Sequence, residues 1–254
     1  MGVVDRDGVQ IAYDVIAGPG DAVPLFLTHG YSASQAMWAP NLMALAADRA
    51  VVTIDLRGHG KSASPDEQRL YSHELSVADM AAVMDACGIE RAAVGGLSLG
   101  GYLSLAFYAA HPQRVACLLL FDTGPGFRSD ASRAKWNEWA TRQATRIEER
   151  GAGALASTAE VSRTDVNPKG LANAARGMLA QQDGSVMASL PNVKVPTLVL
   201  VGADDERFLA AADYMAKTIP DAEKVVIPEA GHAANIDQPA AFNAAVVDFL
   251  RRHA

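Results

Sequence analysis

The chain has 254 residues and half of them are hydrophobic, enough to bury the core of one α/β domain with an insertion, or of two domains. The formal net charge is −7 and the chain has no lysine- or arginine-rich cluster, which excludes nucleic acid as an expected partner. The two cysteines, Cys87 and Cys117, lie in apolar stretches, which predicts buried thiols in a reducing compartment rather than a disulfide.

No export or membrane segment is expected. The N-terminus lacks a basic region followed by an apolar run, which argues against a signal peptide. The uncharged stretch 92–110 contains four glycines and two serines, so it favours a buried strand, turn and helix over a membrane span. We therefore expect a cytoplasmic protein without a membrane partner.

The first predicted elements are mainly strands. Asp7-Gly8 is a hairpin signal, and alternating apolar and polar residues over 9–18 predict the strand that follows it. Two apolar runs, 23–30 and 50–60, each end in polar and glycine residues, which is typical of strands buried on both faces of a parallel sheet. Between these runs, apolar residues at helical spacing over 34–48 predict a helix.

Helices and strands then alternate along the chain. The predicted elements are a helix at 73–87, a strand at 91–95, a helix at 99–111, a strand at 115–121, a strand at 197–202, a helix at 206–218, a strand at 223–227 and a helix at 233–252. Alternation of this kind predicts an α/β fold with a doubly wound, mostly parallel sheet and helices on both faces.

Residues 124–192 interrupt the alternation with helical segments and no apolar strand. They predict a helical cap inserted into a core formed by 1–123 and 193–254. The segment carries nine Lys and Arg against seven Asp and Glu, so its charge is +2 while the remainder carries −9. Trp136 and Trp139 lie about one helical turn apart, which favours the core of a cap helix over contact with a ligand.

The stretch from Gly96 to Gly100 reads G-x-S-x-G and lies between a predicted strand and a predicted helix. It matches neither the G-x-G-x-x-G pattern of dinucleotide sites nor the G-K-[ST] ending of a P-loop. A serine on a sharp strand-to-helix turn stands clear of the sheet, and glycines two residues before and after it avoid a collision. The pattern therefore predicts a nucleophilic Ser98 in a strained conformation.

A serine nucleophile requires a base, and the base requires an acid. Three histidines follow Ser98, but His111 lies at the far end of the same helix, about 20 Å away, and His253 is next to the C-terminus. His232, in a loop between the last predicted strand and helix, is the expected base.

The acid should follow an apolar strand, within loop reach of the base. Asp205 is favoured, and Asp122 is its main rival. Asp204 is a further candidate, and its alternative interpretation is a residue at the N-terminal end of a helix.

An oxyanion hole needs two backbone amides. Leu99, which follows the nucleophile, should supply one, and Tyr31, in the loop after the strand at 23–30, the other. The loop 55–62 predicts a buried polar network in which Arg57 and His59 are structural. No metal-ligand spacing occurs, so no metal site is expected.

Five segments resemble, in order, the motifs of serine α/β-hydrolases with a helical cap: LTHGYS, DLRGHGKS, GGLSLGGYLSL, LVGADD and AGHAANIDQP. The resemblance covers nearly the whole chain. It implies a triad of Ser98, Asp205 and His232, with Tyr31 and Leu99 as oxyanion donors. The serine argues against the dehalogenase, epoxide hydrolase and dienelactone hydrolase chemistries of this fold, which use Asp or Cys.

The resemblance further implies acyl transfer without a cofactor, on a small or medium carboxylic ester or lactone. Hydrolysis of an enol-lactone or of a carbon–carbon bond in a ring-cleavage pathway stays open, and so does a small-molecule receptor with a vestigial hydrolase site. Trp38, Phe127, Trp136 and Trp139 are the candidates for substrate contact.

Overall fold

An eight-stranded sheet runs through the centre of the protein, in the order β1-β2-β4-β3-β5-β6-β7-β8. The computed structural model describes residues 1–155, 158–161 and 166–254. The strands are β1 (Gly2–Arg6), β2 (Val9–Ile16), β3 (Leu25–Thr28), β4 (Val51–Ile54), β5 (Ala92–Leu97), β6 (Val115–Phe121), β7 (Thr197–Gly202) and β8 (Ala222–Ile227). Strand β2 pairs antiparallel with β1 and β4, and every other pairing is parallel, which confirms the predicted sheet.

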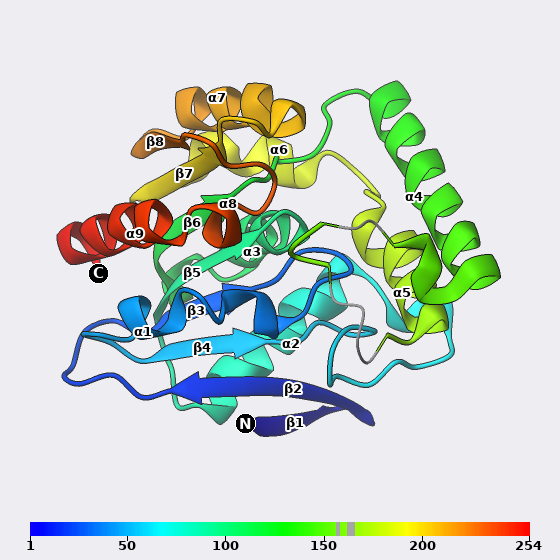
Figure 1. The fold of residues 1–254 in the computed structure, drawn as a ribbon, viewed down its shortest axis with the longest axis horizontal. Helices are drawn as coiled ribbons and strands as arrows, with labels where there is room; N and C mark the ends of the chain where they lie inside the picture. Colours follow the sequence, from blue (N-terminus) through cyan, green and yellow to red (C-terminus); the bar gives the residue numbers. More distant parts are fainter. Residues whose placement is uncertain (156–157, 162–165) are drawn as a thin grey trace.

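Helices cover both faces of this sheet. They are α1 (Leu42–Leu45), α2 (His73–Ala86), α3 (Leu99–Ala110), α4 (Asp130–Arg150), α5 (Pro168–Ala174), α6 (Ser185–Ser189), α7 (Glu206–Thr218), α8 (Ala234–Asp237) and α9 (Pro239–His253). Shorter helical turns are η1 (Gln35–Trp38), η2 (Gln68–Leu70), η3 (Pro112–Arg114), η4 (Gly151–Ala154), η5 (Ala175–Leu179) and η6 (Leu190–Asn192). Figure 1 shows α1 and α9 on the near face of the sheet and α2 and α3 on the far face. The fold is therefore the doubly wound α/β fold that the alternation predicted.

Two predicted helices are interrupted by proline. The helix expected over 34–48 is divided into η1 and α1, with Pro40 between them. The helix expected over 233–252 is divided into α8 and α9, and Pro239 opens the second part. Proline lacks the amide hydrogen that a continuous helix needs, and its ring clashes with the preceding turn.

The N-terminal hairpin has the turn that its sequence predicted. Asp7 and Gly8 connect β1 to β2 and have φ angles of 54° and 84°. Two consecutive residues with positive φ form the turn whose twist matches that of the flanking strands.

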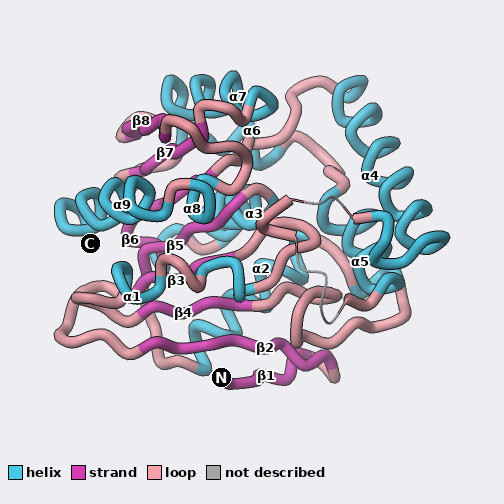
Figure 2. Tube along the Cα trace, viewed as in Figure 1, coloured by secondary structure: helices cyan, strands magenta, loops and turns pink. Residues whose placement is uncertain are grey.

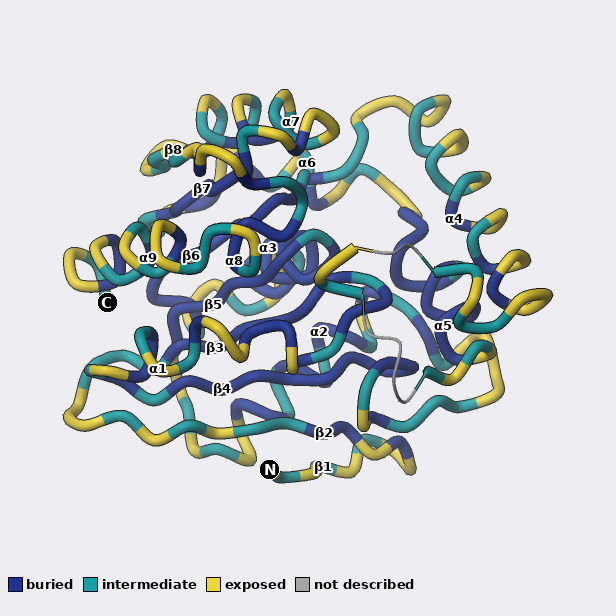
Figure 3. The backbone as a smooth tube through the Cα atoms, in the orientation of Figure 1, coloured by how far each residue is buried: buried dark blue, intermediate teal, exposed yellow. Residues whose placement is uncertain are grey.

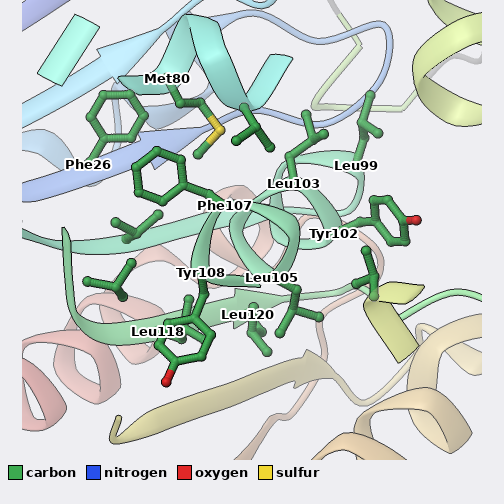
Figure 4. Close-up of a cluster of buried hydrophobic side chains, with 14 of the residues drawn as sticks. Phe26, Met80, Leu99, Tyr102, Leu103, Leu105, Phe107, Tyr108, Leu118 and Leu120 are labelled. Atoms are coloured by element: carbon green, nitrogen blue, oxygen red, sulfur yellow. The ribbon is translucent and has the colours of Figure 1, made fainter. Parts of the chain in front are cut away.

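Two apolar cores fill the space between the sheet and its helices. The central strands β3 to β7 are buried along their whole length, whereas one side of α4 faces solvent (Figure 3). Figure 4 shows one core, in which Leu103 and Phe107 of α3 pack beside Met80 of α2 and Phe26 of β3. The second core joins the opposite face of the sheet to α1 and α9. Helix α3 is thus held rigidly, and the turn that precedes it is fixed by the same packing.

Between β6 and β7, the described residues form the helices α4, α5 and α6 and the turns η4, η5 and η6, joined by loops and without a strand, and we call this segment the insertion. Its residues 156–157 and 162–165 lie outside the described part. Strand β4 points toward the side of the sheet where α4 and α5 lie (Figures 1 and 2). In α6 and η6, Val186 and Leu190 belong to the main core. The end of the insertion is therefore integrated into the packing of the α/β core.

The loop between β4 and η2 contains the polar network that its sequence predicted. The guanidinium of Arg57 is buried and donates from Nη2 to Asp79 of α2 at 2.8 Å. The hydroxyl of Ser62 donates to the carbonyl of Asp55 at 2.6 Å. His59 is buried here, and desolvation, with the nearby His29 as a smaller cause, lowers its pKa to about 3. The Nδ1 atom of His59 lies 2.9 Å from the carbonyl oxygen of Arg57, so both residues belong to this buried network.

Candidate active site

Ser98 lies on the turn that connects β5 to α3. Its φ of 56° and ψ of −113° place it in a region that non-glycine residues rarely occupy. Its amide donates to the carbonyl of Phe121 at 2.9 Å, and its carbonyl accepts from the hydroxyl of Thr123 at 2.6 Å. Strand β6 and the residues after it therefore hold the turn. The strained conformation of Ser98 is the one that the G-x-S-x-G pattern predicted.

The glycines at 96 and 100 are required by close approaches of the backbone. A Cβ on Gly96 would lie 2.5 Å from the carbonyl oxygen of Thr28, and a Cβ on Gly100 would lie 2.2 Å from the same oxygen. Both separations are far shorter than van der Waals contact. The collision expected from the sequence thus involves the end of β3, the neighbouring strand.

Replacing Gly100 with alanine is expected to lower the free energy of unfolding by about 1–3 kcal/mol or more, because backbone atoms must move to admit the methyl group. Thermal unfolding measures this as a fall in Tm of about 2–4 °C per kcal/mol. Gly153→Ala is the matched control, since nothing lies within 4 Å of a Cβ at that position. Equal Tm values for the two variants would contradict this account of the turn.

His232 and Asp205 meet across two loops. Asp205 immediately precedes α7 and is buried, and His232 lies between β8 and α8. Their Nδ1 and Oδ2 atoms are 2.7 Å apart. The ring of Phe208 stacks on the imidazole with a centroid separation of 5.0 Å and an interplanar angle of 21°. The imidazole is therefore fixed both in its plane and at Nδ1.

The surroundings of His232 favour its protonated form. Burial alone would lower the pKa of the imidazole, but the hydrogen bond to Asp205 and the charges of Asp205 and Asp122 raise it above the ordinary value of 6.5. An imidazole that is stabilised as a cation is suited to hold a proton transiently during a reaction.

Asp122 occupies a different place from Asp205. It is fully buried after β6 with a φ of 45°, and its Oδ1 accepts from the amide of Gly202 at 2.7 Å. Its Oδ2 has no hydrogen-bond partner among the described residues. Burial raises the pKa of this carboxyl to about 7, although the Gly202 hydrogen bond and the nearby His232 act in the opposite direction. Asp122 thus joins the ends of β6 and β7, and the carboxylate hydrogen-bonded to His232 is Asp205.

The two predicted oxyanion donors lie on either side of the turn. Leu99 is the first residue of α3, and Tyr31 follows Gly30, whose Cβ would lie 3.4 Å from the Cβ of Ser98. In the described part of the chain, neither the Leu99 amide nor the Tyr31 amide donates an intramolecular hydrogen bond. Neither amide is therefore engaged by the described backbone.

His29 supports the loop that carries Tyr31, a role that the sequence did not suggest. Its Nε2 accepts from the amide of Leu56 at 3.0 Å, so the hydrogen is on Nδ1, which donates to the carbonyl of Gly30 at 2.6 Å. Desolvation lowers the pKa of this buried imidazole to about 4 and keeps it neutral. The sequence signals were the place of this histidine between a buried strand and a glycine and its inclusion in the LTHGYS motif.

A mostly apolar cavity of about 130 Å³ opens beside Ser98. Its lining comes from the turn, the insertion and α7: Ser98, Leu99, Tyr102, Thr123, Gly124, Gly126, Phe127, Trp136, Leu179, Gln181, Arg207, Phe208 and Ala211. Phe127 and Trp136 therefore lie where the sequence analysis expected substrate contacts.

Trp38 and Trp139 do not line this cavity. Trp38 is fully buried in the core on the α9 face of the sheet, with its ring 6.0 Å from that of Phe121. Its assignment as a substrate contact is thus corrected, because the apolar residues of η1 face the sheet. Trp139 packs on Trp136 at 4.7 Å, and both side chains are half-buried. Because Trp136 also lines the cavity, the pair does not lie wholly in the core of the insertion.

No helix in the described ranges is both long and apolar enough to cross a membrane. The same ranges contain no group of three or more His, Cys, Asp or Glu side chains placed to hold a metal ion.

A mostly parallel eight-stranded sheet with a serine on a strained turn before a helix defines the α/β-hydrolase fold. The profile of the alpha/beta hydrolase family matches residues 25–245. The chain belongs to this family, which confirms the resemblance seen in its motifs.

Known relatives span almost the whole chain. A putative 2-succinyl-6-hydroxy-2,4-cyclohexadiene-1-carboxylate synthase of Bacillus subtilis is 28% identical over 273 residues, covering 98% of this chain and 99% of that protein. The 3-oxoadipate enol-lactonase 1 of Acinetobacter baylyi is 29% identical, covering 94% and 92%. Among solved structures, a thermophilic esterase from Thermogutta terrifontis is similar, with a TM-score of 0.85 and 29% identity over 99% of this chain and 97% of that one. These similarities support hydrolase activity.

Proposed function

We propose that this protein hydrolyses a small carboxylic ester through an acyl-enzyme on Ser98. The observation that carries the proposal is the position of Ser98, on a strained turn in the wall of an apolar cavity. The hydrogen-bonded pair of His232 and Asp205 supports it, because a serine is activated by a base that an acid orients.

In the proposed first step, Nε2 of His232 takes the proton of the Ser98 hydroxyl as Oγ attacks the carbonyl carbon of the ester. The amides of Tyr31 and Leu99 bind the oxyanion that forms. The bond to the leaving alcohol then breaks, and the alcohol departs with the proton that His232 held.

In the second step, His232 removes a proton from water, and the hydroxide attacks the acyl carbon. The acid leaves, and Ser98 recovers its proton. Throughout, Asp205 accepts a hydrogen bond from Nδ1, which keeps the imidazole in the productive tautomer and stabilises its charged form. No cofactor enters these steps.

The cavity suggests a short acyl or alcohol group. A cavity of about 150 Å³ in another protein holds a benzene molecule, so about 130 Å³ fits a group of about six heavy atoms. Substrate screening should therefore begin with short esters and small lactones. Because a relative is named as an enol-lactonase, an enol-lactone belongs in the same screen.

The proposal is tested by intact mass after incubation with a serine-reactive fluorophosphonate. A single adduct is expected on the wild type and none on Ser98→Ala. A well-folded wild type that forms no adduct would overturn the proposal and favour the small-molecule receptor with a vestigial site.

The pH dependence of kcat/KM should have an acid limb with its midpoint above 6.5, because only neutral His232 can accept the proton and its pKa is raised. Activity is therefore lost as pH falls through this value. In Asp205→Asn the limb is expected to move to lower pH, because the hydrogen bond and charge that raise the pKa are gone while burial remains. Initial rates from about pH 5 to 9 measure the acid limb of the wild type and that of Asp205→Asn. The same midpoint in both proteins would contradict the assignment of the raised pKa to Asp205.

A further inference from the structure

Arg207 is the one charged residue among those found to line the cavity within the described residues. It lies in the first turn of α7, two residues after Asp205, and its side chain is exposed at the cavity mouth. The rest of the lining is largely apolar, so this guanidinium is the main polar feature that a substrate meets beyond Ser98.

Two packed aromatic rings support the guanidinium. Its Cζ lies 5.3 Å from the ring centroid of Trp139, which packs on Trp136 at an interplanar angle of 36°. The indole nitrogen of Trp136 donates to the carbonyl of Leu179 at 2.7 Å, which anchors this pair of rings in the insertion. An arginine on an aromatic face keeps its donors directed outward and loses part of its water.

The charge of Arg207 has no carboxylate partner among the described residues. The acidic side chains next to it in sequence are otherwise placed: Asp205 binds His232, and Asp204 and Glu206 are exposed without an ion pair to Arg207 in this part of the chain. An unpaired guanidinium at the mouth of an apolar cavity fits an anionic group on the ligand.

Gln181 adds a second donor to the same cavity. Its side chain is buried, and its Oε1 accepts from the amide of Phe127 at 3.1 Å. Its Nε2 donates no hydrogen bond to the described residues. The described residues that line the cavity therefore include hydrogen-bond donors and no carboxylate.

We propose that Arg207 binds a carboxylate of the substrate, so that the enzyme acts on esters carrying a free carboxylate group. This proposal rests on the proposed function and names its substrate class. The guanidinium can form two parallel hydrogen bonds to a carboxylate, while Trp139 supports its opposite face.

The test compares esters that differ only in charge. Monoethyl glutarate carries the carboxylate on the acyl side, and ethyl 5-methylhexanoate replaces it with an isopropyl group. 4-Acetoxybutanoate carries it on the alcohol side, and 4-methylpentyl acetate is its neutral counterpart. We expect the wild-type kcat/KM of at least one charged ester to exceed that of its neutral counterpart by about fivefold or more. The pair that shows this difference tells whether Arg207 binds the acyl side or the alcohol side of the ester.

Three variants assign the preference to Arg207. Arg207→Met should reduce kcat/KM for the favoured charged ester by the same factor and leave the neutral ester nearly unchanged. Arg207→Lys, which keeps the charge, should retain part of the preference. Lys217→Met, at the other end of α7, removes the same charge away from the cavity and should have no effect.

Equal use of charged and neutral esters by an active wild type would overturn the carboxylate proposal and leave the ester hydrolase intact. Calorimetric binding of glutarate gives an independent readout in Ser98→Ala, where turnover is absent. Binding that is lost when Arg207→Met is added supports the proposal even if no ester is hydrolysed. Undetectable binding, or binding unchanged by Arg207→Met, would overturn it.

Discussion

Replacing Ser98 with alanine is expected to lower kcat by about 10⁴-fold or more, because the proposed acyl-enzyme forms on its hydroxyl. The fold should persist, since the Ser98 hydroxyl makes no hydrogen bond to the described residues and an alanine carries the same Cβ on the strained turn. Rates on an ester that the wild type hydrolyses measure the loss, and thermal unfolding checks the fold.

Ser104→Ala is the control for this experiment. Ser104 lies six residues further on in the chain, and its buried hydroxyl donates to the carbonyl of Gly100 at 2.8 Å. This variant should keep most of its activity. Near wild-type turnover by Ser98→Ala would remove Ser98 as the nucleophile.

The acid is tested by comparing Asp205→Asn with Asp122→Asn. Asp205→Asn should reduce kcat by about 10³- to 10⁴-fold, because an amide no longer enforces the productive tautomer of His232. Asp122→Asn should cost less than about tenfold, since the asparagine oxygen can still accept from the Gly202 amide. Steady-state rates at a fixed pH above the acid limb make the comparison.

The opposite ranking would assign the role of the acid to Asp122. Circular dichroism and Tm of both variants separate a catalytic loss from unfolding. For Asp122→Asn the removal of a fully buried carboxyl should leave stability unchanged or increase it at high pH, where that carboxyl would be charged.

The parts of the site that the sequence predicted are those set by local backbone geometry. The turn at Ser98 requires glycine at fixed offsets, so a pattern of five residues is enough to locate it. His232 followed from the order of strands and the small number of histidines. Asp205 was preferred over Asp122 by loop reach, and the hydrogen bond to His232 agrees with that preference.

The parts that were missed depend on how separate segments pack. Trp38 follows Tyr31 by only seven residues, yet its ring lies in the core on the α9 face of the sheet. There it packs against the rings of Phe121 and Phe242. Arg207 becomes a cavity residue only because α4 of the insertion packs near α7. No periodicity in the sequence encodes such a contact between elements that are distant in the chain.

Tyr31 joins two parts of the molecule that are usually treated as separable. Its hydroxyl donates to the carbonyl of Leu171 in α5 at 2.9 Å, while its backbone follows Gly30, which lies beside Ser98. Insertions of this kind are attractive units for exchange between enzymes, because they carry much of the substrate contact. Here such an exchange would also remove the hydrogen bond between the Tyr31 hydroxyl and the Leu171 carbonyl. A chimaera with a new substrate range would therefore need another acceptor for the Tyr31 hydroxyl to keep its rate.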